Sequence, residues 1–298
     1  MQPLHIQTPL IQSQHLKNTL GKTMYFKLES LQPSGSFKLR GIGRLCQRHQ
    51  GAQSIVASSG GNAGVAVAYS GMKLSKPTTI FIPSSSHPIY IEAIKSFGAK
   101  VIISGVTSGD AQLAAEEFAR THQAAYIHPF DHPEIWKGHS TIIDEVVSQH
   151  VRPDAVIVSV GGGGLACGVL EGMHRHGWHD VPFLAVETIG ADVFSQSVHA
   201  NRPVKLSAIT SKATSLGATY VTPKLLEWPK KHAIKNIIVS DEQAEIGSRS
   251  FAKDQRLLVE LASGASLSLV YGDHPTIRDY GSILVIVCGG INTSHFNI

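Results

Sequence analysis

The chain has 298 residues, of which 42% are hydrophobic, and this length suits one large domain or two smaller ones. Its net charge of +4 comes without a long block of lysine or arginine, so the sequence favours neither a nucleic-acid nor a membrane-surface partner. Three widely spaced cysteines argue against a disulfide framework or a zinc site, and no apolar run reaches the length of a membrane span.

The N-terminal stretch "MQPLHIQTPL" lacks the apolar segment of a signal peptide, so we expect a cytoplasmic protein. The first unusual segment is "QPSGSFKLRG" (Gln32–Gly41), where one lysine, Lys38, follows a run of small residues and opens an apolar helical pattern. Lysine shifts its pKa readily when buried and forms Schiff bases, so Lys38 is a candidate catalytic residue. A capped helix start with a solvated lysine head is the alternative.

From residue 54 onward, short β-rich runs alternate with helical patterns. Strands are predicted at 54–59, 78–83, 100–105, 155–160, 182–187, 236–241 and 283–288, and helices at 62–74, 91–98, 110–122 and 163–177. The helix at 110–122 is expected to begin with Asp110 as its N-cap. Strands this apolar are buried on both faces, and their alternation with helices predicts parallel sheets.

We therefore predict an α/β protein of two domains, each with a twisted, mostly parallel sheet flanked by helices. The small domain is expected at residues 34–139, which hold the early strand–helix units. The large, cofactor-binding domain is expected at residues 1–33 and 140–298. A cleft between two such α/β layers is a common ligand site, so we expect the active site there.

Two glycine-rich turns each follow a predicted strand and open a predicted helix. "SVGGGGLACG" (Ser159–Gly168) exposes backbone N–H groups at a helix N-terminus, which predicts a phosphate site. "ASSGGNAG" (Ala57–Gly64) clusters N–H and O–H donors that suit a carboxylate. Close helix–strand packing and an ordinary N-cap turn are the respective alternatives.

Three further features leave other functions open. The first glycine turn also reads as G-x-G-x-x-A with Glu187 ending the next strand, the pattern of a dinucleotide-dependent dehydrogenase. Cys288 ends a buried strand at a position that lines ligand sites in open α/β sheets, although a buried cysteine is also an ordinary core residue. Two histidine groups, at 128, 132 and 139 and at 174, 176 and 179, suggest a metal site, but neither has a cysteine or carboxylate nearby at helical ligand spacing.

A lysine in a Ser/Gly turn, two anion sites and a polar group at a strand end are what pyridoxal phosphate needs from a protein. The motifs "PSGSFKLRG", "SSGGNAG", "PFDHPEIWKGH", "SVGGGGL", "AVET" and "CGG" occur in this order over nearly the whole chain. In these motifs the sequence resembles the fold-type II pyridoxal-phosphate enzymes, which share the fold of the tryptophan synthase β subunit. Among them it resembles the serine/threonine dehydratase family, and most of all the liver-type L-serine dehydratases and their dehydratase-like paralogues.

The resemblance assigns cofactor roles to individual residues. Lys38 is similar to the Schiff-base lysine, Phe37 lies against the pyridine ring, and Asn62 holds the phenolic oxygen. Cys288 faces the ring nitrogen. The phosphate is bound by the backbone of Gly161, Gly162, Gly163, Gly164 and Leu165.

The resemblance also implies substrate and cation sites. Ser59 acts with Lys38 in catalysis, and the substrate is held by Ser59, Gly60, Gly61, Asn62 and Phe130. A monovalent cation, expected to be K⁺, is bound by Gly161, Glu187, Ala191, Val193, Leu216 and Ala218. An unpaired buried carboxylate at Glu187 would be unfavourable without such a cation.

The implied function is a dehydratase (ammonia-lyase) that converts L-serine to pyruvate, or L-threonine to 2-oxobutanoate, with release of ammonia. Such an enzyme is expected to be a cytoplasmic homodimer that serves amino-acid catabolism and gluconeogenesis. A β-replacement enzyme such as a cysteine synthase is the alternative, although "KLRG" is more similar to dehydratases than to the Lys-Asp-Arg of cysteine synthases.

Two positions depart from common members of the family. Cys288 stands where many relatives carry serine, and Gly60 stands where the liver-type dehydratases carry alanine. A missing methyl group beside the carboxylate turn would loosen the reactive geometry. The sequence therefore predicts that Gly60→Ala raises kcat on serine.

Overall fold

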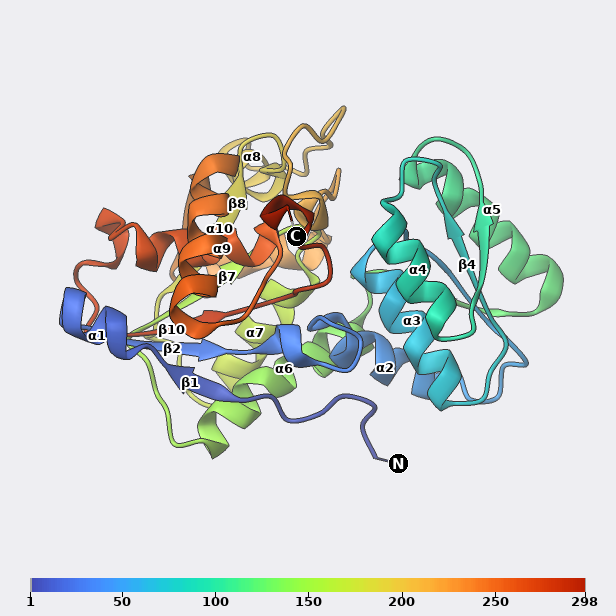
Figure 1. The fold of residues 1–298 in the computed structure, drawn as a ribbon. Coiled ribbons are helices and arrows are strands. Elements are labelled where there is room, and N and C mark those ends of the chain that lie inside the picture. The colour runs from blue at the N-terminus through green and yellow to red at the C-terminus, as the bar shows by residue number, and fades with distance from the viewer. Residues whose placement is uncertain (1, 298) are drawn as a thin grey trace. The chain divides into compact units, whose positions relative to one another are not determined.

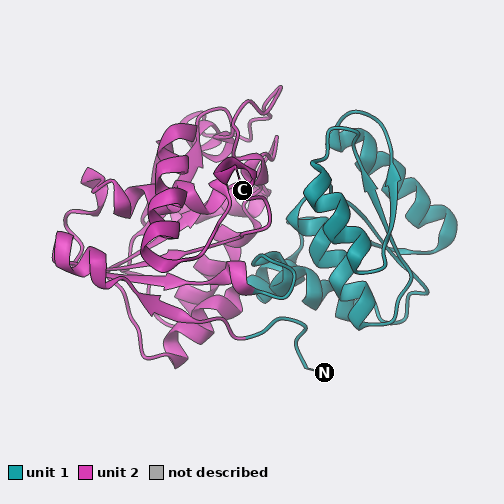
Figure 2. Cartoon of the chain, in the orientation of Figure 1, with its two compact units in different colours: residues 1–6, 32–139 teal, residues 7–31, 140–298 magenta. Residues whose placement is uncertain are grey.

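The computed structural model describes residues 2–297, which form two compact α/β units (Figures 1 and 2). Unit 1 consists of the N-terminal residues up to Ile6 together with Gln32–His139, and unit 2 consists of Gln7–Leu31 and the chain from Ser140 onward. Helix α6 (Pro133–Ser148) runs through the boundary.

The N-terminal segment belongs to unit 1, whereas all of residues 1–33 were expected in the large domain. The Gln32 side-chain amide explains the difference. Its Oε1 accepts the Ile6 N–H (3.0 Å) and its Nε2 donates to the Ile6 carbonyl (2.9 Å). These two hydrogen bonds tie the segment to the strand-to-helix connection that leads to Lys38.

Unit 1 is built on a four-stranded parallel sheet with the order β5-β4-β3-β6. Its strands are β3 (Ile55–Ser58), β4 (Thr78–Ile82), β5 (Lys100–Ile103) and β6 (Ala125–Ile127), and its helices are α2 (Lys38–Arg48), α3 (Asn62–Lys73), α4 (Pro88–Ser96) and α5 (Ser108–His122). Helices α3 and α4 lie on one side of β4 and α5 on the other (Figure 1). Val56 and Phe81 pack against Ala111 and Ala115 of α5, so both faces of the sheet are covered.

Unit 2 is built on a six-stranded sheet with the order β1-β2-β10-β7-β8-β9, in which only β1 is antiparallel to its neighbour. Its strands are β1 (Leu10–Gln12), β2 (Thr23–Lys27), β7 (Ala155–Ser159), β8 (Phe183–Thr188), β9 (Ile234–Val239) and β10 (Ser282–Ile286). Its helices, besides the second part of α6, are α1 (Gln14–Leu20), α7 (Gly164–Arg175), α8 (Val193–His199), α9 (Asp241–Gln255) and α10 (Leu261–Tyr271), with short 3₁₀ helices at Glu29–Leu31, Thr214–Leu216 (η2), Pro223–Lys230 (η3), Pro275–Ile277 and Ser294–Phe296.

The predicted fold class of two mostly parallel α/β sheets is confirmed. Three strands that carry weak signals, β1, β2 and β6, were not predicted, nor were the helices α1, α6, α8, α9 and α10. The prediction that Asp110 is the N-cap of α5 was wrong. Thr107 caps the helix, and Asp110 lies three positions later. Thr107 Oγ1 accepts the Asp110 N–H (3.2 Å), and Asp110 Oδ2 accepts the Thr107 N–H (2.8 Å), which is a capping box.

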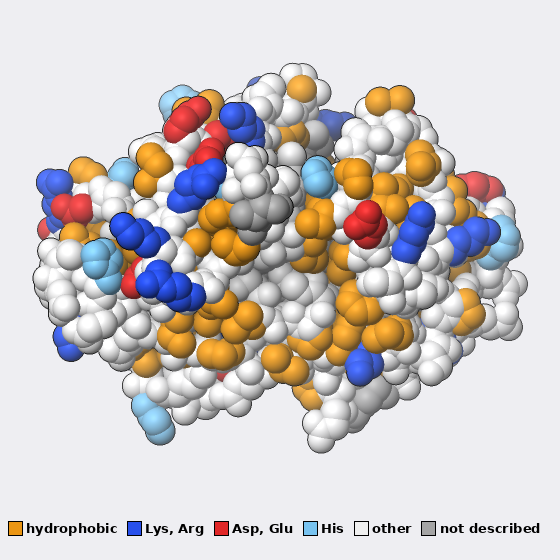
Figure 3. Space-filling model, viewed as in Figure 1, with side chains coloured by type: hydrophobic (Ala, Val, Ile, Leu, Met, Phe, Trp, Pro, Cys, Tyr) orange, Lys and Arg blue, Asp and Glu red, His pale blue; other side chains and the backbone are white. Residues whose placement is uncertain are grey.

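On the face drawn in Figure 3, lysine and arginine side chains are dispersed among acidic and apolar ones. Across residues 2–297, the helices are all too short or too polar to cross a membrane.

Candidate active site

Lys38 is the first residue of α2 and is half-buried in unit 1. Its Nζ donates to the Pro129 carbonyl (2.8 Å) and lies 5.2 Å from the centroid of the Phe37 ring. Pro129 precedes Phe130 in the loop after β6. The structure therefore brings three predicted site residues, Phe37, Lys38 and Phe130, into one part of unit 1.

The predicted carboxylate turn, Ser59 to Gly61, connects β3 to α3, and Asn62 opens that helix. Gly61 is the N-cap residue and makes no side-chain cap bond, and the first N–H groups of a helix have no acceptor within the helix itself. A Cβ at Gly64 would collide with the Ser59 carbonyl, so this glycine lets α3 start directly against the turn. Because β3 and β6 are parallel neighbours, the turn and the Phe130 loop leave the same edge of the sheet.

The Phe130 loop is held by hydrogen bonds to the His128 ring. His128 Nδ1 accepts the N–H groups of Phe130 (3.3 Å) and Asp131 (2.8 Å), and Trp136 Nε1 donates to the Phe130 carbonyl (3.0 Å). Burial lowers the pKa of His128, with Asp131 opposing that shift and Lys38 adding to it. An unprotonated Nδ1 is therefore favoured. It accepts two hydrogen bonds from the loop whose Pro129 carbonyl accepts the Lys38 amine.

His139, which the sequence placed only in a possible metal-binding histidine group, lies beside the lysine turn. Its buried ring meets the Phe37 ring edge-on at 4.8 Å between centroids, and neither ring nitrogen has a hydrogen-bond partner. Burial, then the charges of Lys38 and Arg40, hold its pKa well below the usual value. A Cβ at Gly41 would lie 2.7 Å from His139 Cε1, so glycine at 41 permits the contact.

The predicted phosphate loop of unit 2, Gly161 to Gly164, connects β7 to α7. The Thr222 N–H donates to the Gly162 carbonyl (2.9 Å), so the N–H of the same planar peptide, on Gly163, points the opposite way. Gly163 has a φ of +89°, and a Cβ there would lie 2.8 Å from Leu225 Cδ2. A turn that only glycine fits, at the N-terminus of a long helix, suits a phosphate group.

Cys288 is buried just beyond β10, and its Sγ lies 3.3 Å from Ser263 Oγ in α10. Ser263 Oγ also donates to the Gly289 carbonyl (2.8 Å) and accepts the Gly289 N–H (3.0 Å). Since β10 and β7 are parallel neighbours, Cys288 and the phosphate loop leave the same edge of the unit 2 sheet. Sequence reasoning missed Ser263, because a serine in the first turn of a helix carries no functional signal.

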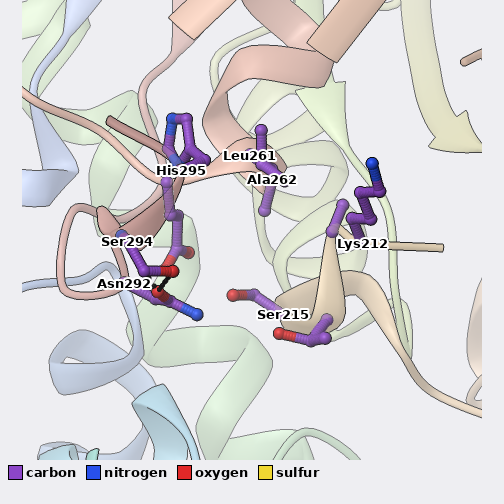
Figure 4. A pocket seen from close by; sticks show the side chains of 10 residues that line it. Lys212, Ser215, Leu261, Ala262, Asn292, Ser294 and His295 are labelled. Carbon is purple, nitrogen blue, oxygen red and sulfur yellow. Dashed lines mark hydrogen bonds between the residues drawn. The ribbon is translucent and has the colours of Figure 1, made fainter. Parts of the chain in front are cut away.

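A small pocket of about 40 Å³ opens beside the N-terminal turn of α10, the turn that carries Ser263. Figure 4 shows Ser215, Asn292, Ser294 and His295 around it, from η2 and the C-terminal segment. Its volume suits one or two water molecules rather than an amino acid. A more open pocket of about 560 Å³ beside α8 and β9 is lined by none of the predicted site residues.

Glu187, in β8, is fully buried but not unpaired, so the premise of the cation expectation was wrong. Its Oε1 accepts the Phe194 N–H (2.8 Å), and its Oε2 accepts the N–H (2.7 Å) and hydroxyl (2.5 Å) of Ser195. Burial nevertheless raises the pKa of Glu187 to about 7. A carboxylate enclosed by the first turn of α8 is not placed to bind a ribose, which weakens the dehydrogenase alternative.

The other predicted cation ligands are backbone positions in unit 2. A Cβ at Gly161 would lie 3.0 Å from the Leu216 carbonyl oxygen, which also accepts the Ala218 N–H (2.7 Å). Val193 opens α8 next to the two residues that bind Glu187, and the Ala191 N–H donates to the Thr188 carbonyl (2.9 Å). Carboxylate and carbonyl oxygens are the ligands that hard cations prefer. Among residues 2–297, no cluster of three or more His, Cys, Asp or Glu side chains could hold a metal ion.

Comparisons with known proteins cover nearly the whole chain. A profile of the family described as "Pyridoxal-phosphate dependent enzyme" matches residues 1–289. The chain is 42% identical over 304 residues to the L-serine dehydratase/L-threonine deaminase of Bos taurus, covering 98% of this chain and 93% of the relative. It is 40% identical over 302 residues to a serine dehydratase-like protein of Homo sapiens, covering 98% and 92%. The crystal structure of a fungal L-serine ammonia-lyase from Rhizomucor miehei superposes with a TM-score of 0.93 at 36% identity, covering 99% and 98%.

Proposed function

Because the chain belongs to the family of pyridoxal-phosphate dependent enzymes, we propose that it is a dehydratase of L-serine and L-threonine. The products are pyruvate or 2-oxobutanoate, and ammonia. The observation that carries the proposal is the half-buried Lys38 amine, which lies at the Phe130 loop in a chain about 40% identical to dehydratases over almost its full length.

Pyridoxal phosphate supplies, when bound, an aldehyde that captures amines and a ring that withdraws electrons from the α-carbon. In the proposal, unit 1 holds the aldehyde through Lys38, the ring face through Phe37 and the phenolic oxygen through Asn62. Unit 2 holds the phosphate through the N–H groups of Gly161 to Leu165 and the ring nitrogen through Cys288. The glycine-shaped phosphate turn supports this assignment.

The chain's own residues then divide the work on the substrate. The turn at Ser59 to Asn62 binds the carboxylate and so fixes the α-carbon. Lys38, whose place on the aldehyde the substrate amine would take, would remove the α-proton. The β-hydroxyl would leave as water with one proton, which balances the α-proton that Lys38 takes up. Hydrolysis of the released enamine would then give the 2-oxo acid and ammonia.

Three finer assignments belong to this proposal. K⁺ binds at Glu187 with the carbonyl groups of Gly161, Ala191, Val193, Leu216 and Ala218, which the oxygen-rich donor set supports. The enzyme works as a homodimer in the cytoplasm, which rests on the resemblance alone.

Lys38→Ala tests the reaction. We expect the parent to release 2-oxo acid from serine and to retain the cofactor covalently after borohydride, as seen by mass on the peptide that contains Lys38. The variant should lose both properties. Lys137→Ala, an exposed lysine in α6 that pairs with Glu134, is the matched control and should keep them. A fully active Lys38→Ala protein would refute the cofactor assignment.

The reaction products distinguish the proposed dehydratase from the alternative β-replacement enzyme. A cysteine synthase would form cysteine from sulfide and an activated serine without releasing pyruvate, whereas the proposed dehydratase releases pyruvate from serine alone. If the parent protein forms cysteine without releasing pyruvate, the proposed dehydratase function is wrong.

A further inference from the structure

The loop after β4, at residues 83–87, reaches the carboxylate turn of unit 1. Strands β3 and β4 are parallel neighbours, so the loops that follow them leave the same edge of the sheet. A Cβ built on Gly60 would collide with Ser86 Oγ and would lie 2.7 Å from Ser86 Cβ. The Ser86 side chain therefore fills the space that any side chain at position 60 would need.

The backbone on both sides of Ser86 is held by hydrogen bonds. The Ser86 N–H donates to the Pro83 carbonyl (3.1 Å), and the Ser84 N–H donates to the Gly105 carbonyl (3.1 Å). On the other side, His87 Nδ1 accepts the Ile89 N–H (3.3 Å) and caps α4. A loop held on both sides of Ser86 makes the approach to Gly60 a fixed feature of unit 1.

The Ser86 hydroxyl is buried and has no hydrogen-bond partner. Its neighbour Ser85 is exposed, and the Ser85 hydroxyl donates to the Val106 carbonyl (3.3 Å). A buried hydroxyl that makes no hydrogen bond is unfavourable, so such a group in a binding turn indicates a ligand atom as its partner. In the proposed function, the ligand at this turn is the α-carboxylate of the amino acid.

We propose that Ser86 is a substrate-binding residue that donates its hydroxyl proton to the α-carboxylate, and that Gly60 is glycine because it makes room for Ser86. This inference rests on the proposed function and deepens it. It also reverses the expectation from sequence for Gly60→Ala. The added methyl group would displace Ser86 instead of tightening the turn, so this single substitution should weaken substrate binding.

Ser86→Ala tests the hydroxyl in the cofactor-loaded enzyme. A hydrogen bond to a carboxylate exists in both the bound substrate and the transition state, so its loss should raise KM for L-serine and change kcat little. We expect calorimetric Kd for L-alanine, which has no β-hydroxyl to eliminate, to rise about 10-fold, as for loss of a hydrogen bond to a charged group. Ser85→Ala is the matched control and should bind L-alanine as the parent does.

The steric relation between positions 60 and 86 is tested by comparing Gly60→Ala with the double variant Gly60→Ala/Ser86→Gly. We expect Gly60→Ala alone to lower Tm and weaken L-alanine binding, and Ser86→Gly in the same chain to restore Tm. Unchanged L-alanine affinity in Ser86→Ala, with the parent's Tm, would overturn the inference. If the parent binds L-alanine through Ser86 but releases no 2-oxo acid from serine, the proposed reaction fails and the inference stands.

Discussion

Cys288 contacts the hydroxyl of Ser263, and this contact affects how its thiol could interact with a ring nitrogen. Ser263 bridges the thiol and the Gly289 backbone, so the side chain at 288 is held in a small polar network. A thiol is a weak donor and a weak acceptor, whereas a hydroxyl is strong in both roles. The residue at 288 therefore sets how strongly this network can interact with the cofactor.

We predict that Cys288→Ser keeps cofactor binding and shifts the pH–rate profile for serine. The shift is expected because a hydroxyl exchanges a stronger hydrogen bond with the ring nitrogen and so changes its protonation. Rates measured from pH 6 to 9 check the prediction. Cys46→Ser, at a buried cysteine in α2 whose pKa burial raises to about 12, is the control for loss of a buried thiol. Superimposable profiles for Cys288→Ser and the parent would make Cys288 an ordinary core residue.

Helices α9 and α10 cross at a pair of glycines, and this crossing places Ser263. A Cβ at Gly264 would collide with the Ala244 carbonyl, and one at Gly247 would lie 2.5 Å from the Ser268 nitrogen. The backbones of the two helices are therefore in direct contact. Because Ser263 precedes Gly264 in α10, a displacement of this part of α10 would also move Ser263 relative to Cys288.

Gly264→Ala should push the two helices apart. We predict a loss of roughly 2–3 kcal/mol in the free energy of unfolding, as for overpacking in a core, together with weaker cofactor retention. Denaturant unfolding and cofactor titration measure the two effects. Gly109→Ala in α5 is the control, because its nearest neighbour would be Thr107 Oγ1 at 3.6 Å, an ordinary contact. Equal stability of Gly264→Ala and the parent would show that the helices can separate freely.

At the scale of the whole molecule, the burial of Glu187 makes stability depend on pH, and the proposed K⁺ site would add a dependence on the cation. Its pKa is raised from 4.5 to about 7 in the folded state, so folding favours its protonated form. The favourable contribution is complete below pH 4.5 and is lost as pH rises through 7, by on the order of 3 kcal/mol without a cation. A cation that binds the carboxylate competes with the proton and opposes this loss.

We therefore predict that K⁺ raises Tm more at pH 8 than at pH 5. Melting in potassium chloride and in tetramethylammonium chloride at equal ionic strength separates binding from screening. Glu187→Gln removes both the titration and the charge, so its Tm should respond equally to the two salts. The same Tm gain from K⁺ at both pH values in the parent would count against a cation at Glu187.

Whether a feature could be predicted from the sequence depends on how far apart along the chain the interacting residues lie. Alternating apolar strands and helices, the lysine turn and both glycine turns are local patterns, so the sequence alone predicted the fold class, the family and the candidate cofactor residues. The partners of those residues come from distant segments. Pro129 lies 91 positions from Lys38, Ser263 lies 25 from Cys288, and His139 and Ser86 carry no local signal. Only tertiary packing decided that a serine occupies the space beside Gly60 and that α8 encloses Glu187, because steric exclusion and burial depend on every segment that fills the same volume.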